Sequence, residues 1–303
     1  MTTHISIEET CRHGRNVTDL YLDHLLIVID DLEEVVKDYR SLGFTVESSR
    51  EVEDGGLQRA RILFADTDRT YLELLSLPKP WIKRTARVLR GVGLFNLLWA
   101  RNGAMSRYTL ARVTHREGAG DVLLTHAELG SGLAGAGTRG ATLKNLELVP
   151  KTAQNGLPLY QRHSVFRRDG FLPFVTAYTP PHQRLPRVPE NEAATRHANG
   201  VTGVATVTIA VKDLDRSVVA YRALLGLEPC HQLASPLLSV RTVSFSLGST
   251  TLRLAQPTGT GALKDYLKAR GEGPCALTLR TTAGTGRLDD ARTHGMRLEL
   301  IND

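Results

Sequence analysis

An internal repeat is the sequence feature that most restricts how this chain of 303 residues can fold. Residues 21–78 read as strand, helix and three further strands, because apolar runs of strand length surround one amphipathic stretch. The same order returns from residue 204, and the matching pairs are Asp31-Leu32 with Asp213-Leu214 and Tyr39-Arg40 with Tyr221-Arg222. A repeated βαβββ unit predicts a modular α+β fold.

The helix of the first unit is its best-marked element. The apolar residues at positions 32, 35, 36, 39 and 42 fall on one helical face, and acidic residues crowd the first turn. Gly43 suits the position just past the helix end. Residues 44–49, 60–64 and 69–75 then predict the three remaining strands.

The region between the two clear copies reads as a diverged second unit. Residues 81–92 predict a basic amphipathic helix, residues 93–100 a strand and residues 122–129 a helix. Three more strands are expected, at residues 143–149, 159–166 and 172–178.

The glycine-rich stretch at residues 130–135 matches the dinucleotide-binding fingerprint in its spacing alone. That fingerprint needs a strand before it and a long helix after it, whereas here more glycines and an expected strand follow. We expect a flexible connection that could close over a cavity, and no nucleotide cofactor.

A proline-rich stretch divides the chain into two expected domains. Residues 1–20 form an N-terminal arm, residues 21–179 the first domain with two units, and residues 180–200 the linker. Residues 201–303 form the second domain, with a complete third unit and a fourth that stops after strand, helix and strand.

Composition excludes several classes of protein. Hydrophobic residues make up 41% of the chain and charged residues 23%, which is ordinary for a globular protein. The net charge of +6 comes with no nucleic-acid-binding motif, and no apolar run is long enough to cross a membrane. The three cysteines are widely separated and none forms a Cys-x-x-Cys pair, so we expect a cytoplasmic protein.

Two ionisable residues interrupt the first and last apolar runs of the first unit. His24 lies within the run at residues 21–29, and Glu73 within the run at residues 69–75. A buried ionisable side chain without a partner is costly, so each needs one. They could bind each other, or both could face a metal or a ligand.

Taken together, these patterns resemble the vicinal oxygen chelate superfamily, in its glyoxalase-like branch. The resemblance rests on Leu-Asp-His-Leu-Leu-Ile-Val at residues 22–28, on Tyr-Leu-Glu-Leu-Leu at residues 71–75 and on Leu42-Gly43-Phe44. It implies that paired βαβββ units curl into a mixed sheet around a cavity. It also implies that the first and last strands of each unit carry ligands for a divalent metal.

The resemblance assigns His24 and Glu73 to the two ligand positions of the first unit, where iron, manganese, nickel or zinc would suit them. The second unit offers Asn96 in its first expected strand and Thr176 in its last, with His163 as a third possible ligand. The third unit offers Thr206 and Arg253, which cannot form the same site.

Three interpretations of His24 and Glu73 stay open. They could hold a metal, act as a general acid and base, or simply hydrogen-bond each other in a polar interior. Other expected substrate contacts are Arg59, Arg61, Tyr71 and Trp99.

The resemblance favours a small-molecule enzyme that performs a lyase, isomerase, dioxygenase or ring-opening step on an oxygenated substrate. The alternative is a protein of the same fold that sequesters a small molecule, such as an antibiotic, without turnover. No nucleic-acid or membrane partner is expected, and the second domain could serve as the interface of a homodimer.

Overall fold

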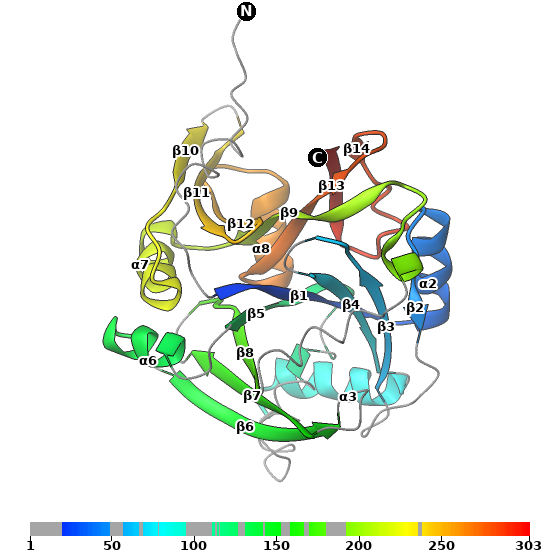
Figure 1. Cartoon of the computed structure of the whole chain (residues 1–303). Coiled ribbons are helices and arrows are strands. Elements are labelled where there is room, and N and C mark those ends of the chain that lie inside the picture. The colour runs from blue at the N-terminus through cyan, green and yellow to red at the C-terminus, as the bar shows by residue number, and fades with distance from the viewer. Residues whose placement is uncertain are drawn as a thin grey trace, which may run out of the picture.

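The computed structural model describes residues 20–48, 57–66, 69–77, 79–94, 111–112, 114, 116–126, 131–141, 143–152, 158–166, 170–179, 192–235 and 238–303. These residues form two mixed sheets with helices around them, and Figure 1 shows the first sheet in blue to green and the second in yellow to red. The α+β fold expected from the repeat is confirmed.

The first sheet has eight strands in the order β2-β3-β4-β1-β5-β8-β7-β6. Its first unit consists of β1 (Leu20–Ile29), α2 (Leu32–Ser41), β2 (Glu47–Ser48), β3 (Gln58–Leu63) and β4 (Tyr71–Ser76). After α3 (Pro80–Gly91), its second unit consists of β5 (Gly118–His126), α6 (Ser131–Thr138), β6 (Leu143–Thr152), β7 (Pro158–Phe166) and β8 (Phe174–Thr179).

The second sheet has seven strands in the order β10-β11-β12-β9-β13-β15-β14. A 3-10 turn, η2 (Glu192–Thr195), precedes β9 (Val201–Ala210), α7 (Leu214–Leu225), β10 (His231–Ser235), β11 (Val240–Leu247) and β12 (Thr250–Pro257). The remaining elements are α8 (Ala262–Arg270), β13 (Gly273–Thr281), β14 (Gly286–Arg287) and β15 (Arg297–Asn302).

The two sheets repeat one pairing pattern. In each, the first strand of a unit runs parallel to its last strand and antiparallel to the first strand of the neighbouring unit. The register sets Leu26 opposite Glu73 in the first sheet and Thr208 opposite Arg253 in the second. Arg253 therefore occupies in the second sheet the place that Glu73 occupies in the first.

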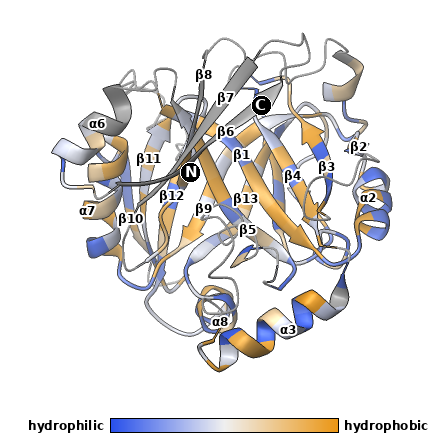
Figure 2. Ribbon diagram, turned by 90° about the horizontal axis from the view of Figure 1, so that it is seen from below, coloured by the Kyte–Doolittle hydropathy of each residue, from blue (hydrophilic) through white to orange (hydrophobic). Residues whose placement is uncertain are grey.

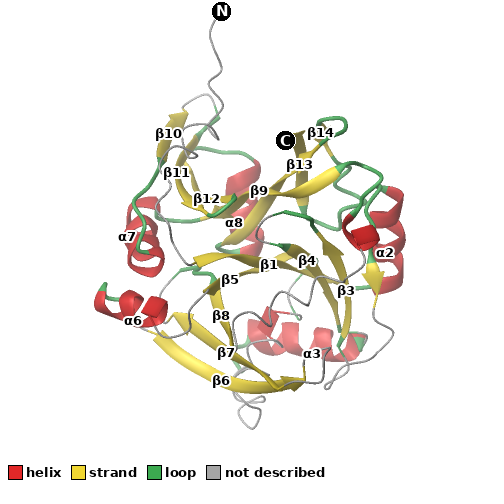
Figure 3. Ribbon diagram, viewed as in Figure 1, coloured by secondary structure: helices red, strands yellow, loops and turns green. Residues whose placement is uncertain are grey.

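The repeated helices begin and pack in the same way. Asp31 caps α2 by accepting hydrogen bonds from the Glu33 and Glu34 amides, and Asp213 caps α7 by accepting one from Arg216. The apolar faces of both helices are buried in one core that also contains strands of both sheets. Figure 2 shows the apolar residues concentrated on the central strands, and Figure 3 shows α2 and α7 flanking them.

Three details of the sequence interpretation need correction. The stretch expected as a helix at residues 122–129 lies largely in strand β5, which pairs with β1 and opens the second unit. The strand expected at residues 93–100 lies mostly outside the described residues. The expected flexible connection contains α6, whose end is held by Arg139 donating to the carbonyl oxygens of Ala223 and Leu224 in α7. The helix of the fourth unit was expected at residues 288–295, of which residues 290–295 form turns.

The short-range sequence signals explain these errors. Val122, Leu123 and Leu124 form a continuous apolar run, which periodicity alone cannot divide between a buried strand and a helix. The glycine content of residues 130–140 argued against a helix, but packing against α7 overrides that weak preference. No helix in the described ranges is long and apolar enough to span a membrane.

His197 joins the segment before β9 to the first sheet. Its Nδ1 accepts a hydrogen bond from the Thr45 amide at 3.0 Å, and its Nε2 donates one to the Leu63 carbonyl oxygen at 3.0 Å. This pattern requires a neutral imidazole, and burial lowers the pKa of His197 below its ordinary value of 6.5, although the bond to Leu63 opposes the shift.

We predict that His197→Ala lowers the free energy of unfolding by about 2 kcal/mol, because two buried backbone groups lose their partner. Since the folded-state pKa lies below 6.5, the unfolded state binds more protons as the pH falls below that value. The stabilisation by His197 should therefore be full above pH 6.5 and decrease below it. Urea unfolding of wild type and variant at several pH values measures both effects, with His231→Ala as the control; equal pH dependence in all three proteins would contradict the prediction.

Candidate functional site

His24 lies between two carboxylates on the face of the first sheet turned away from the shared core. Its Nδ1 donates to Asp23 Oδ2 at 2.6 Å, and its Nε2 lies 3.5 Å from Glu73 Oε2. All three residues are buried, with exposed fractions of 1% for Asp23, 5% for His24 and 7% for Glu73. A histidine placed in this way has both ring nitrogens next to a negative charge.

A β-bulge makes this arrangement possible. Neighbouring residues of a regular strand point to opposite faces, so Asp23 and His24 would ordinarily be separated. The β1–β5 register shifts between Leu22 and His24, so that Leu22 pairs with Leu124 and His24 with Leu123. Asp23 is the extra residue, and the local change in direction brings its carboxylate beside the His24 ring.

Two arginines and a tyrosine complete the cluster. Arg59 Nη1 lies 3.3 Å and Arg61 Nη2 lies 3.9 Å from Glu73 Oε1, and both side chains come from β3, the neighbour of β4. The Tyr71 ring stacks on the His24 ring with centroids 4.5 Å apart, and the Arg61 guanidinium lies 5.8 Å from the Tyr71 ring centre. Four of the predicted site residues, Arg59, Arg61, Tyr71 and Glu73, thus form one cluster with His24.

The charges in the cluster shift the pKa values in opposite directions. Burial opposes the protonated form of His24, but the hydrogen bonds and charges of Asp23 and Glu73 outweigh it and raise the pKa of His24 above 6.5. Burial also opposes the ionised form of Glu73, yet Arg59, His24 and Arg61 together hold the pKa of Glu73 far below its ordinary range. The cluster therefore favours the protonated form of His24 next to an ionised Glu73.

The other predicted site residues divide into two groups. Thr176 is buried in β8, and the backbone register sets it opposite Thr125 of β5 and His163 of β7. Asn96 and Trp99 lie outside the described residues. Thr176 and His163 are thus on strands of the same sheet as His24, two to three strands away from it.

Sequence reasoning missed Asp23 and Asp121. Asp121 follows the bulge of β5 at Gly120 as His24 follows the bulge of β1, so it occupies the place of His24 in the second unit. It is fully buried and pairs with Arg112 Nε at 3.1 Å. The signal was present in the sequence as an acidic residue opening an apolar run, but the expected helix at residues 122–129 concealed it.

The described donors do not fit a divalent-metal site. His24 Nε2 and the Glu73 carboxylate are two donors, and Asp23 binds the opposite side of the imidazole ring. In the described ranges no group of three or more His, Cys, Asp or Glu side chains is placed to hold a metal. Two guanidinium groups at Glu73 also add positive charge where a cation would bind.

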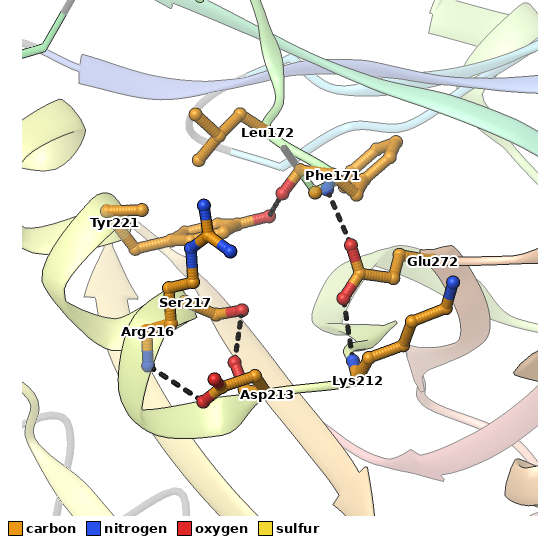
Figure 4. Close-up of a pocket in the computed structure, with 10 residues that line it drawn as sticks. Phe171, Leu172, Lys212, Asp213, Arg216, Ser217, Tyr221 and Glu272 are labelled. Atoms are coloured by element: carbon orange, nitrogen blue, oxygen red, sulfur yellow. Dashed lines mark hydrogen bonds between the residues drawn. The ribbon is translucent and has the colours of Figure 1, made fainter. Parts of the chain in front are cut away.

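A separate cavity of about 500 Å³ lies between the two halves of the molecule (Figure 4). Glu272 braces it by accepting hydrogen bonds from the Phe171 and Lys212 amides at 3.2 and 2.6 Å. Two acidic residues, Asp213 and Glu272, balance two basic residues, Lys212 and Arg216, along its wall. None of the predicted site residues lines this cavity, so His24 remains the centre of the candidate site.

Solved structures share this fold at low sequence identity. A hypothetical protein from Staphylococcus aureus has a TM-score of 0.61 at 9% identity, covering 93% of this chain and 100% of that chain. A mutant of 4-hydroxymandelate synthase from Streptomyces coelicolor has a TM-score of 0.60 at 13% identity, covering 94% of this chain and 93% of that chain. No curated protein matches.

A model of a family described as the glyoxalase-like domain matches residues 22–225. This range includes β1, β4 and the whole cluster around His24, and it continues into α7 of the second half. Because the match spans more than half of the 303 residues, the chain belongs to the glyoxalase-like domain family, within the superfamily that its repeated βαβββ units resemble.

Proposed function

We propose that this protein is a small-molecule enzyme that uses His24 as a general acid and Glu73 as a general base on an anionic, oxygenated substrate. The observation that carries the proposal is the position of His24, buried between Asp23 and Glu73 with Arg59 beside Glu73. Pairs of ionisable groups with opposite pKa shifts in one buried site are typical of acid–base catalysis.

The charge balance of the cluster favours an anionic substrate. His24 in its protonated form, Arg59 and Arg61 contribute three positive charges, while Asp23 and Glu73 contribute two negative charges, which leaves +1. A carboxylate or similar group on the substrate would neutralise this charge. Arg59 and Arg61 are the natural partners, because guanidinium groups bind such oxygen atoms in pairs.

Substrate binding would also prepare Glu73 to accept a proton. Arg59 is the leading cause that lowers the pKa of Glu73, so a substrate anion that draws Arg59 away allows this pKa to rise. Glu73 then removes a proton from a carbon next to a carbonyl group. The carbonyl oxygen becomes negative as the enolate forms, and His24 Nε2–H stabilises it by a hydrogen bond. Glu73 then returns the proton to a different atom of the substrate, which completes an isomerisation.

A binding protein without turnover is the second candidate. It is favoured by the absence of the His–Glu pair from the third unit, where Thr206 and Arg253 stand at the same register positions. The described donors do not fit the metal that the family implies, one of iron, manganese, nickel or zinc at His24 and Glu73. Metal analysis of wild type and His24→Ala checks this, and a metal that wild type binds and His24→Ala loses would contradict it.

We predict that the protein exchanges the acidic C–H protons of small 2-oxo or 3-oxo carboxylates with solvent, and that His24→Gln slows the exchange by about 100-fold or more. Exchange in D₂O followed by proton NMR over a panel of such acids measures this. Tyr21→Phe, at the start of the same strand, serves as the control. Tight binding of an acid with no exchange in wild type would favour the sequestering alternative.

The raised pKa of His24 predicts a pH dependence. Because the folded state holds the proton more tightly than the unfolded state, the stabilisation is full below pH 6.5 and is lost as the pH rises through the folded-state pKa. NMR titration of isotope-labelled His24, with unfolding measured over the same range, tests this sign. A His24 that titrates below 6.5 would contradict it.

Arg59→Gln should raise the pKa of Glu73 and weaken the binding of a carboxylate substrate by about tenfold, because a charged hydrogen-bond donor is lost. Isothermal titration with the best acid of the exchange panel gives the affinity. Arg84→Gln, on the exposed face of α3, is the matched control. Equal affinities of Arg59→Gln and wild type would remove Arg59 from the site.

A further inference from the structure

The cavity of about 500 Å³ beside α7 has a counterpart beside α2, and the internal repeat allows the two places to be compared. Glu117 precedes β5 and accepts a hydrogen bond from the Asp30 amide at 2.7 Å. Glu272 precedes β13 and accepts one from the Lys212 amide at 2.6 Å. In each half this amide belongs to the residue before the helix cap, so Glu117 and Glu272 occupy equivalent positions.

Two buried tyrosines extend this correspondence. Tyr39 of α2 donates a hydrogen bond to the Thr293 carbonyl oxygen at 3.3 Å, and Tyr221 of α7 donates one to the Phe171 carbonyl oxygen at 3.2 Å. Each tyrosine stands at the same position relative to the aspartate that caps its helix. A loop from the other half of the molecule therefore approaches each helix at the same point.

Beside α2, the side chain of His294 fills the space next to Glu117. His294 Nε2 lies 3.0 Å from Asp38 Oδ2, and its Nδ1 lies 3.7 Å from Glu117 Oε2. Only 10% of the His294 side chain is exposed. The first half thus holds an imidazole ring between two acidic side chains, with each ring nitrogen next to a carboxylate.

Beside α7, the same space is open. Ala220 takes the position of Asp38, directly before the tyrosine, and Leu172 takes the position of His294, directly after the bonded carbonyl group. Ala220, Leu172 and Glu272 all line the cavity. This side therefore keeps the acid Glu272 but has no imidazole next to it.

The charged groups at the cavity favour a positively charged ligand. Figure 4 shows the Glu272 carboxylate on the cavity wall, with the Lys212 side chain directed past it and away from the cavity. Asp213 contributes a second carboxylate, whose Oδ1 accepts the hydrogen bond from the Arg216 amide. Arg216 also lines the cavity, but it already has a partner within the chain.

Glu272 can accept a hydrogen bond from a ligand although it already accepts two from backbone amides. The two oxygens of a carboxylate offer about four lone-pair positions, so two remain. Glu117 provides the precedent, because it accepts the bond from the Asp30 amide and also faces the His294 ring.

We propose that the cavity beside α7 binds a small organic cation, with an imidazolium or ammonium nitrogen against Glu272. The ligand takes the place that His294 takes in the first half, and its carbon atoms contact the apolar lining residues Phe171, Leu172 and Ala220. A volume of about 500 Å³ is typical of small-molecule sites and far exceeds the size of a metal ion. This site is separate from His24 and does not depend on the function proposed for that cluster.

Imidazolium chloride and butylammonium chloride are the two probes, with butanol as the neutral counterpart and sodium chloride at the same ionic strength as the salt control. The melting temperature and isothermal titration of the full chain are the two readouts. We expect at least one cation to raise the melting temperature and to bind at least about tenfold more tightly than butanol, because a charged donor bonds a carboxylate more strongly than a neutral one.

Ala220→Leu tests the cavity without changing a charge. The larger side chain fills the space beside Glu272, so the affinity for the cation should fall at least about tenfold, while the melting temperature without ligand stays the same or rises. Ala220→Asp supplies the carboxylate that Asp38 provides in the first half, and it should raise the affinity about tenfold. Ala269→Leu, on the exposed surface of α8, is the matched control.

Glu272→Gln keeps the size of the side chain but removes its charge, and it should weaken cation binding about tenfold. Loss of binding in both Ala220→Leu and Glu272→Gln, with Ala269→Leu unchanged, supports the proposal. It is overturned if neither cation binds wild type more tightly than butanol, or if a folded Ala220→Leu or Glu272→Gln protein binds the cation as wild type does. An unchanged affinity in Ala220→Asp would contradict the equivalence of the two places.

Discussion

Strand β1 is hydrogen-bonded on both sides, parallel to β4 and antiparallel to β5, and the rest of the first sheet depends on this position. The parallel pairing brings Glu73 near His24, although 49 positions separate them in the sequence. The antiparallel pairing contains the bulge at Asp23, whose carboxylate binds the same ring. One strand with two different neighbours thus assembles a buried charged cluster from residues that local structure alone would keep apart.

The fold could be predicted from the sequence because its signals are local and repeated. The cap at Asp31 and the apolar face of α2 recur at Asp213 and α7, and each copy supports the interpretation of the other. The second unit has no such clear local signals. Val122 to Leu124 form an unbroken apolar run, and α6 is rich in glycine. There, packing against other elements decides the structure, and a sequence window does not contain that packing.

The candidate site was predictable only in part, for a physical reason. His24 and Glu73 interrupt apolar strands, and an ionisable residue within an apolar run can be recognised from the sequence alone. Asp23 gives no such signal, because a regular strand would turn it away from His24 and only a register shift brings the two together. Asp121 was hidden in the same way, since its relation to His24 appears once β5 is known to be a strand.

The core that both sheets share has a consequence for how such a chain can evolve. Apolar residues of β1, α2 and β5 pack in the same cluster as those of β9, α7 and β13, so each half keeps water from the other. A half separated from its neighbour would expose this surface and tend to aggregate. Substitutions on the face of each sheet turned away from this core can therefore accumulate independently, as with Glu73 in the first sheet and Arg253 at the equivalent position of the second. The two halves, in contrast, must stay together in one chain.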